Sequence, residues 1–379
     1  MKPIPYGRQS IDDDDICAVI DVLHSDWLTT GPKIDEFERS ISDYCGCRHA
    51  VAVNSGTSAL DIAVQVLGFP QGSEIITTPF TFAATSNAIL YNRLTPVYAD
   101  IIRGTRNIDP KDICRKITPK TRAVLIVDFA GQPCELKAIQ KVCRDHGLVL
   151  IEDACHALGA SYGNKKVGTI ADMTIFSFHP VKAITTGEGG MIVTDNEGYA
   201  KKLTLLRTHG IDKSLSPHDG PSAGWEYDMV ELGRNYRMTD LQAALGTSQL
   251  KKLDLFVDKR KGLARQYADR CSDLSFIEFP ESIADISHAW HILTVLVNGI
   301  DRNSFFTYLR AHNVGVNLHY IPTYRLRYYK EHLPQDPARF PVTEDVYNRI
   351  ITLPLFPGMT EDEVHYVVDT MKDAYQAIK

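Results

Sequence analysis

The sequence has no apolar run that approaches the roughly 20 residues of a membrane span, and no apolar N-terminal stretch typical of a signal peptide. Its formal net charge of -6, without a lysine- and arginine-rich run, argues against a dedicated nucleic-acid surface. The eight cysteines are scattered, and Cys45 and Cys47 are spaced too closely for a common zinc site. We therefore expect a cytoplasmic protein with reduced thiols, no metal site, and no membrane or nucleic-acid partner.

The sequence also lacks a strand followed by the GxGxxG pattern with which nicotinamide-dependent enzymes hold a dinucleotide pyrophosphate. What it has is a globular composition, with 44% hydrophobic and 23% charged residues over 379 positions. That length predicts one large domain and a smaller one.

Short β-rich runs alternate with helical patterns between residues 50 and 195. About seven strands predict an α/β fold with a mostly parallel sheet. The run GGMIVTD follows MTIFSF too closely for a helical crossover, which predicts an antiparallel strand. The runs are HAVAV, SEIITTP, LTPVYAD, AVLIVDFA, LVLIEDA, MTIFSF and GGMIVTD.

The pattern changes after residue 238, where a long helical stretch with mixed charges begins and a break is expected near Asp254. The remainder predicts a smaller α+β domain, with HAWHILTVLV as a strand and TEDEVHYVVDTMKDAYQAI as a helix. We expect a large domain over residues 12–250 and a small one over 251–379 with 1–11. The stretch SLSPHDGPSAG predicts a long loop.

Residues that follow strands are the candidates for chemistry, because ligands of open α/β sheets bind at the carboxyl ends of strands. The first such end is VNSGTSAL, where a helix begins near Thr57. Free N–H groups there and the hydroxyls of Thr57 and Ser58 suit a phosphate, with Gly56 between strand and helix. An ordinary N-cap at Ser55 or Thr57 explains the same residues, so this motif alone leaves both readings open.

Three further strand ends carry distinctive side chains. Asp153, with His156 close behind it in LIEDACHALGA, either caps a helix or pairs with a pyridine nitrogen. Phe82 in TTPFTFAAT belongs either to the core or against a bound aromatic ring. Ser177 and Lys182 lie in SFHPVKAITTGEGG, and an enclosed lysine of lowered pKa attacks a carbonyl. Together these parts predict a pyridoxal phosphate enzyme.

The sequence resembles the DegT/DnrJ/EryC1/StrS sugar aminotransferases over nearly its whole length. The resemblance rests on NSGTSAL, TTPFTFAAT, EDACHALGA, SFHPVKAITTGEGG, LGRNYRMTDLQAALG and HYIP, in the family's order. It implies a fold type I pyridoxal phosphate-dependent transferase, with a mostly parallel seven-stranded sheet in the large domain. Dehydratase relatives carry histidine at the position of Lys182, so the lysine favours transamination.

The resemblance also implies roles for individual residues. Lys182 would be the Schiff-base lysine and proton shuttle, Asp153 the partner of the pyridine nitrogen, and His156 a neighbour of the cofactor's phenolic oxygen. Phe82 would stack on the ring. Residues that would hold the phosphate are Gly56, Thr57, Ser58, Ser177 and, from the second subunit of a homodimer, Asn235. Residues that would border the substrate are Thr29 of WLTTGP, His319 and Tyr320.

Within the family, the sequence most resembles the transaminases of pseudaminic acid synthesis, through the stretches VDFAGQP, FSFHPVKAITTGEGG and HYIPTYRLRYY. This resemblance implies an enzyme that aminates C4 of a UDP-linked 4-keto-6-deoxy-N-acetylhexosamine with L-glutamate. The gluco-configured ketosugar of bacillosamine or legionaminic acid synthesis is the alternative substrate. A non-catalytic sensor on the same fold would be expected to lose the lysine or the aspartate.

One departure from the family concerns the stretch after HYIP, where Tyr324 stands in place of a histidine found in many relatives. Any contact assigned to that histidine does not carry over. Arg325, Arg327 and Tyr329 are expected either to meet the UDP diphosphate or to lie on the surface.

Overall fold

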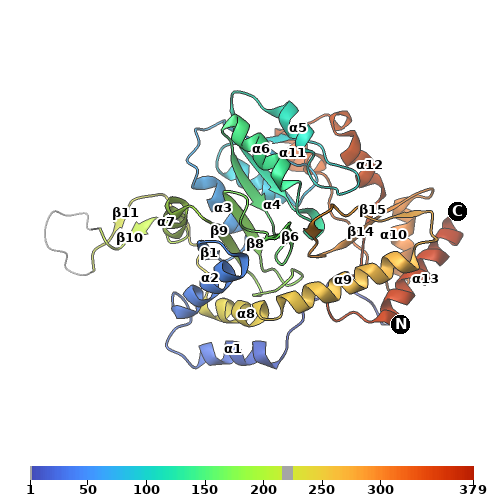
Figure 1. Ribbon diagram of the computed structural model, residues 1–379, viewed down its shortest axis with the longest axis horizontal. Helices are drawn as coiled ribbons and strands as arrows, with labels where there is room; N and C mark the ends of the chain where they lie inside the picture. The colour runs from blue at the N-terminus through green and yellow to red at the C-terminus, as the bar shows by residue number, and fades with distance from the viewer. Residues whose placement is uncertain (1, 216–224) are drawn as a thin grey trace.

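The computed structural model of the chain describes residues 2–215 and 225–379. Its centre is a seven-stranded sheet in the order β1-β9-β8-β5-β4-β2-β3 (Figure 1). In that order the strands are His49–Val53, Gly190–Thr194, Met173–Ser177, Val149–Asp153, Thr121–Val127, Glu74–Thr77 and Thr95–Tyr98. The predicted seven-stranded α/β sheet is therefore confirmed. Of the loop predicted from SLSPHDGPSAG, residues 216–224 lie outside the described residues.

The direction of the strands gathers most of their carboxyl ends at one edge. Strands β8, β5, β4, β2 and β3 are parallel, and β9 runs antiparallel to both β8 and β1. The antiparallel course predicted for β9 is thus confirmed. Because β1 and β8 flank the reversed strand, β1 points the same way as the parallel strands, and its end meets theirs.

Helices cover both faces of this sheet. One face packs against α3 (Gly56–Gln65), α4 (Ala83–Tyr91) and α7 (Glu197–Leu206) through the apolar residues that alternate along the strands. The other face packs against α2 (Pro32–Cys45), α8 (Asp240–Leu250), the start of α9 (Leu253–Arg270), α5 (Pro110–Lys116) and α6 (Leu136–His146). The sheet is buried on both sides, which explains why its strands read as nearly continuous apolar runs.

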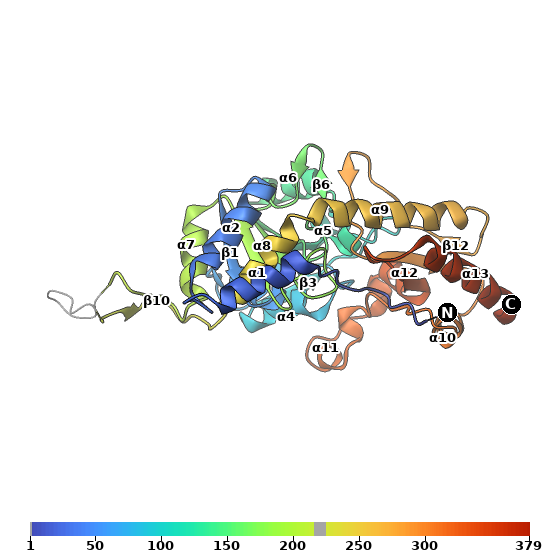
Figure 2. The ribbon, with the colours of Figure 1, turned by 90° about the horizontal axis from the view of Figure 1, so that it is seen from below.

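The C-terminal part has its own apolar core around a three-stranded antiparallel sheet of β12 (Ile277–Glu278), β14 (Leu293–Val297) and β15 (Ile350–Leu353). Helices α10 (Arg302–Ala311), α13 (Glu361–Ile378) and the later half of α9 pack on it. Ile4 is part of this core, and both chain ends lie beside it (Figure 2). The proposed division at residue 250 stays a prediction.

The long helical stretch breaks between α8 and α9, at Lys251 and Lys252, as expected near Asp254. Helix α1 (Asp13–Leu23) is fixed to this break through the buried Asp15. Its carboxylate accepts hydrogen bonds from Ser248 at 2.7 Å and Gln249 at 2.6 Å, and pairs with Lys252 at 2.7 Å. Within residues 2–215 and 225–379, no helix is long and apolar enough to cross a membrane.

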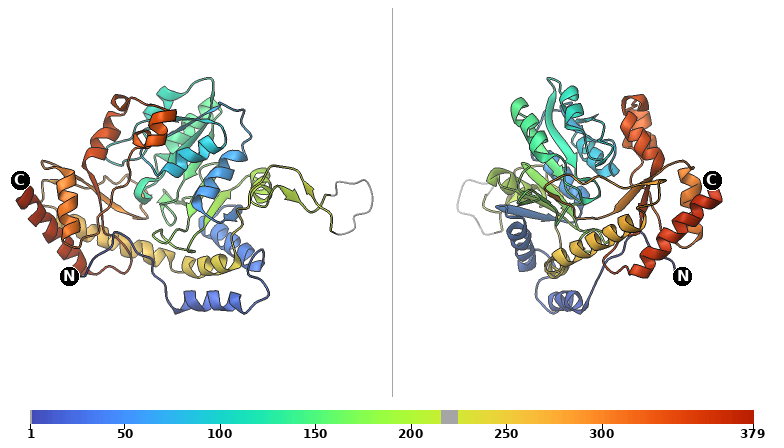
Figure 3. Two further views of the ribbon diagram at one scale, coloured as in Figure 1. Left: turned by 180° about the vertical axis from the view of Figure 1, so that it is seen from behind. Right: turned by 45° about the vertical axis from the view of Figure 1, so that its right-hand side comes forward.

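The remaining elements are short. Strands β6 (Ser161–Tyr162), β7 (Lys165–Lys166) and β13 (Ile286–Ser287) form a small sheet, and α11 (Arg327–His332) and α12 (Pro341–Arg349) precede β15. Short 3-10 turns are η1 (Phe129–Gly131), η2 (Thr323–Arg325) and η3 (Pro337–Arg339). The hairpin of β10 (Ile211–Asp212) and β11 (Asp228–Met229) projects from the main body (Figure 3).

Candidate active site

A cavity of about 370 Å³ opens at the carboxyl ends of the sheet strands, and we call it the strand-end cavity. Its walls come from the residues after β1, β2, β4, β5 and β8, together with Lys182 and the segment after β14. Predicted site residues that line it are Gly56, Thr57, Phe82, Asp153, His156, Ser177, Lys182, His319 and Tyr320. The fold therefore brings together side chains that are scattered along the sequence.

The start of α3 forms one end of this cavity. Ser55 is its N-cap, with its hydroxyl accepting from the Ser58 N–H at 3.0 Å, so the capping reading of Ser55 is confirmed. Gly56 and Gly190 let the chain pass closely here: a Cβ on Gly56 would lie 2.9 Å from Cβ of Ser177, and one on Gly190 would lie 2.4 Å from the Ser55 carbonyl oxygen. The free end of the helix faces the cavity as an anion site would.

We call the start of α3 with Gly56, Thr57 and Ser177 the anion cradle. Ser58 lies beside it but does not line the cavity. Its hydroxyl donates to Asn54 Oδ1 at 2.7 Å, and its side chain is buried. It fixes the turn that presents Gly56 and Thr57, while the hydroxyls of Thr57 and Ser177 border the open space.

Asp153 ends β5 and is nearly buried. Its Oδ2 accepts a hydrogen bond from Thr85 on α4 at 2.8 Å, and its Oδ1 accepts from the Cys155 N–H at 3.3 Å. Residues 154–160, which directly follow Asp153, contain no helix, so its carboxylate is not a helix cap. The bonds hold the carboxylate in a fixed orientation at the cavity wall, as pairing with a ring nitrogen requires.

Lys182 reaches the cavity from the turn after β8, where its N–H donates to the His179 carbonyl at 2.9 Å. Its own carbonyl accepts from the buried Arg260 at 3.2 Å, so the backbone under the lysine is tied to α9. Burial lowers the pKa of the Lys182 amine, while Cys155 and Asp153 oppose the shift. A lowered pKa favours the neutral amine that a nucleophile or proton acceptor needs.

Three histidines that line the cavity, His156, His291 and His319, are neutral. The Tyr320 hydroxyl and His156 Nε2 are 3.1 Å apart, and the rings of His156 and His291 lie 4.4 Å apart. Burial, followed by the positive charge of Lys182, lowers the pKa of His156, and burial lowers that of His319 to about 4. These imidazoles are therefore uncharged near neutral pH.

His156 supplies a direct test of whether a cofactor fits. Its Nδ1 is buried and has no hydrogen-bond partner among the described residues. An unpaired buried polar atom costs about 1–3 kcal/mol, so a bound group that pairs with it is favoured. With the anion cradle at one end and the Asp153 carboxylate on the wall, the donor set fits a phosphorylated pyridine.

A pair of buried carboxyl groups lies next to Asp153 in the sheet. Asp128 accepts from the Cys134 N–H at 2.9 Å, and Glu152 accepts from the Thr174 hydroxyl at 2.7 Å. The other oxygen of each carboxyl is buried, and the two carboxyl groups can pair with each other when one of them holds a proton. Burial, and then the charge of Glu152, raises the pKa of Asp128, so Asp128 retains its proton.

Besides Ser58, the predicted site residues Thr29 and Asn235 do not line the strand-end cavity of their own chain. Thr29 is exposed and bridges to Thr239 at the start of α8. Asn235 is exposed beside the projecting hairpin, and its carbonyl accepts from Asn54 at 3.4 Å.

The residues around HYIP correct one expectation. Tyr329 was expected at the diphosphate or on the surface, but it is buried and its hydroxyl donates to Asn87 at 2.6 Å. Tyr324 is buried too, and donates to Glu344 at 2.7 Å. Arg325 pairs with the same glutamate, whereas Arg327 is exposed.

The sequence patterns did not point to several residues of the cavity. Tyr6 and His291 line it from distant parts of the chain, and Cys155 and Glu188 line it from within recognised motifs. The spacing of four residues between Thr81 and Thr85 is the one signal that could have predicted Thr85. In the structure their hydroxyls lie 2.9 Å apart. Tyr6 has no local signal, since it precedes the first helix.

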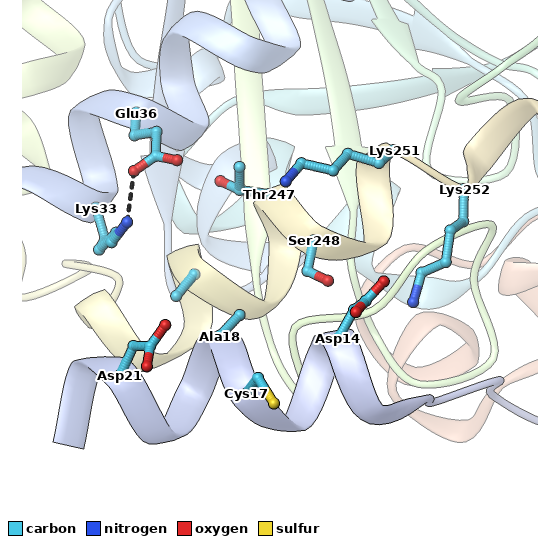
Figure 4. A pocket seen from close by; sticks show the side chains of 11 residues that line it. Asp14, Cys17, Ala18, Asp21, Lys33, Glu36, Thr247, Ser248, Lys251 and Lys252 are labelled. Atoms are coloured by element: carbon cyan, nitrogen blue, oxygen red, sulfur yellow. Dashed lines mark hydrogen bonds and ion pairs between the residues drawn. The ribbon is translucent and has the colours of Figure 1, made fainter. Parts of the chain in front are cut away.

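A second hollow, of about 420 Å³, lies between α1, α2 and α8, and we call it the helical hollow. Figure 4 shows Asp14 and Asp21 of α1 facing Lys251 and the Lys33–Glu36 ion pair. Its charges are exposed or paired with each other. It is similar in size to the strand-end cavity, but it contains none of the strand-end residues that carry chemistry.

Solved structures similar to this chain include one with the expected cofactor. Spr1654 of Streptococcus pneumoniae, in its PLP form, matches with a TM-score of 0.93 and 30% identity over 100% of both chains. The Helicobacter pylori aminotransferase PseC, involved in the biosynthesis of pseudaminic acid, matches with a TM-score of 0.92 and 32% identity over 100% of both chains. This fold and cavity therefore belong to enzymes that bind pyridoxal phosphate.

Sequence comparison agrees with the structural match. The spore coat polysaccharide biosynthesis protein SpsC of Bacillus subtilis is 38% identical over 375 residues, which cover 98% of this chain and 96% of that protein. The model of the DegT/DnrJ/EryC1/StrS aminotransferase family matches residues 9–372. The chain belongs to this family and is a pyridoxal phosphate-dependent sugar aminotransferase.

Proposed function

We propose that the protein transfers the amino group of L-glutamate to C4 of a UDP-linked 4-keto-6-deoxy-N-acetylhexosamine, and forms the L-altrosamine product of pseudaminic acid synthesis. The observation that carries the proposal is the meeting of Lys182, Asp153 and an anion cradle in one cavity. The match to PseC over the whole chain supports this choice of sugar.

Pyridoxal phosphate, when bound, supplies an electron sink for the carbon that loses its proton. We assign its phosphate to Gly56, Thr57 and Ser177, which surround the free end of α3. Phe82, 60% exposed at the cavity, covers the ring face. Asp153 pairs with the ring nitrogen, because its carboxylate is held in place by hydrogen bonds.

Lys182 would hold the cofactor through its aldehyde carbon, and its amine would move the proton. Its Nζ removes the Cα proton of glutamate in the first half-reaction and returns a proton to the sugar C4 in the second. Burial lowers the pKa of this amine, which favours the neutral form that accepts a proton. His156, neutral and unpaired at Nδ1, donates to the phenolic oxygen of the cofactor.

We also propose that the protein works in the cytoplasm as a homodimer in which Asn235 reaches the phosphate of the other subunit. Support comes from the exposed position of Asn235 beside the projecting hairpin. That hairpin and the segment after it present exposed apolar side chains, with Trp225 73% and Leu232 71% exposed. Such side chains are suited to burial against a second copy. Thr29 is expected to border the sugar in the same assembly.

The experiment that tests the sugar assignment uses both ketosugar epimers. The purified enzyme with L-glutamate should aminate the epimer that leads to L-altrosamine, and the product's C4 configuration is read by nuclear magnetic resonance. Preferential amination of the gluco-configured ketosugar would replace the proposed substrate with that of bacillosamine or legionaminic acid synthesis.

The dimer assignment has an independent test. Asn235→Ala and Lys182→Ala are each expected to be nearly inactive, because each removes one part of a shared site. Mixing the two variants should restore part of the activity, since a mixed dimer contains one intact site. No recovery after verified exchange of subunits would argue against sharing.

A further inference from the structure

The segment before α1 is anchored by contacts at Tyr6 and on both sides of it in the sequence. Ile4 bridges to Val314 in the C-terminal core, and the Tyr6 carbonyl accepts from the Leu355 N–H at 3.0 Å. Further along, the Ser10 carbonyl accepts from Gln249 on α8 at 2.9 Å. The backbone on both sides of Tyr6 is therefore fixed, and its side chain is held at the cavity before any ligand binds.

Tyr6 extends an aromatic wall. Its ring centroid lies 5.6 Å from that of His319, which lies 4.7 Å from that of Tyr320. Tyr320 in turn lies 6.0 Å from Phe82. Aromatic walls with a few polar groups are typical of sites for small uncharged ligands.

The hydroxyl of Tyr6 is available to a ligand. Among the described residues it has no hydrogen-bond partner, although the ring is half-buried and burial raises the pKa of the phenol. The hydroxyl of Tyr320, by contrast, is engaged with His156. The aromatic wall thus offers one free phenol that can donate to or accept from a sugar hydroxyl or an acetamido group.

The charges around this wall distinguish between the two substrates. Lys182 is the only lysine or arginine among the described residues that line the cavity, and Asp153 and Glu188 are acidic. His156 and His319 are neutral. Glutamate, a dicarboxylate, gains little binding energy from a wall without further positive charges. An uncharged hexose ring, in contrast, can stack on the aromatic rings and form a hydrogen bond with the Tyr6 hydroxyl.

We propose that Tyr6 is a specificity-determining residue that contacts the hexose ring of the ketosugar and not the amino donor. The proposal rests on the sugar aminotransfer proposed above. It predicts that changes at Tyr6 separate the two halves of the reaction, which share one cavity and one lysine.

The test measures each half-reaction alone, by the absorbance change of the bound cofactor in single turnover. Tyr6→Phe should lower kcat/KM for the ketosugar by about 10-fold, since one hydrogen bond is worth about 0.5–1.5 kcal/mol. Tyr6→Ala should lower it by roughly 100-fold, because the ring is lost as well. The half-reaction with glutamate should change by less than about two-fold in both variants.

Tyr308 provides a matched control. It is also a half-buried tyrosine beside a histidine, with its ring 4.1 Å from that of His312, but it lies on α10 outside the cavity. Tyr308→Ala should leave both half-reactions as they are. Equal losses in the two half-reactions of Tyr6→Ala, or no loss in either, would overturn the proposal.

A binding measurement separates failure of this proposal from failure of the proposed function. Calorimetry with UDP-N-acetylglucosamine, which cannot be aminated at C4, reports recognition without turnover. Tyr6→Ala should weaken this binding about 10-fold or more, and Tyr308→Ala should not. Unchanged binding in Tyr6→Ala overturns the role of Tyr6 even if neither ketosugar proves to be a substrate.

Discussion

The strand-end cavity and the helical hollow are similar in size but differ in how their polar groups are arranged. The helical hollow is lined by exposed charges that neutralise each other, such as Lys33 and Glu36. The strand-end cavity contains a lysine of lowered pKa, neutral histidines and an unpaired ring nitrogen on His156. Keeping such groups together is costly to stability unless a ligand or a reaction uses them.

The comparison shows that volume does not identify the site in this fold. Charged side chains at the helical hollow are solvated on the surface, where ion pairs contribute about 0–1 kcal/mol. At the strand ends, burial changes protonation states, and the parallel sheet aligns groups from separate strands. Substitutions of buried groups at the strand ends are therefore expected to have larger effects than substitutions of solvated charges at the helical hollow.

The largest effect is expected from Lys182→Ala. Turnover should fall by at least about 10³-fold, because the proton acceptor and the attachment point of the cofactor are both lost. The visible absorbance of the bound cofactor should change with it. Turnover close to that of the native enzyme would show that a group other than Lys182 transfers the proton.

A smaller loss is expected from Asp153→Asn. The amide keeps the shape of the carboxylate but not its charge, and hydrogen bonds to charged groups are worth about 1.5–3 kcal/mol, so turnover should fall roughly 10- to 100-fold. Asp14→Asn in the helical hollow is the matched control and should be neutral. Equal losses of turnover in the two variants would contradict the assignment of catalysis to the strand-end cavity alone.

Asp128→Asn should alter stability rather than turnover. Because the folded pKa of Asp128 is raised, the folded protein holds a proton that the unfolded chain releases above about pH 4. That contribution is complete at low pH and is lost as the pH rises through the folded pKa, at up to about 1.4 kcal/mol per pH unit.

The asparagine does not titrate and can still donate to Glu152. The free energy of unfolding of the variant, from urea titrations between about pH 5 and pH 8, should therefore fall less steeply with pH than that of the native protein. Identical slopes would show that Asp128 is not the protonated member of the pair.

The smallest effect is expected from Lys251→Ala, at the centre of the helical hollow (Figure 4). Its side chain is exposed and no ion pair holds it within the described residues. Stability should change by less than about 0.5 kcal/mol and turnover by less than about two-fold. A large loss of turnover would give the helical hollow a role in catalysis.

The sequence predicted the sheet and much of the cavity, because both depend on local patterns. Asp153 and Lys182 each follow an apolar strand, and the carboxyl ends of parallel strands meet at one edge. The reversed direction of β9 followed from its short connection to β8. Motifs at strand ends are informative because the sheet itself fixes where they meet.

The residues that sequence patterns missed reach the cavity through long-range contacts. Tyr6 arrives there because Ile4 bridges to Val314, and no periodic pattern records that pairing. The burial of Tyr329 against Asn87 is likewise a contact between distant segments. Neither contact could be inferred from spacing, since tertiary packing leaves no local signal.

The most direct test of the account is to find the lysine that carries the cofactor. The native enzyme loaded with pyridoxal phosphate is reduced with borohydride, digested and mapped by mass spectrometry. The account predicts a phosphopyridoxyl group on Lys182 alone. A cofactor fixed instead on Lys251, or on any other lysine outside the strand-end cavity, would contradict it.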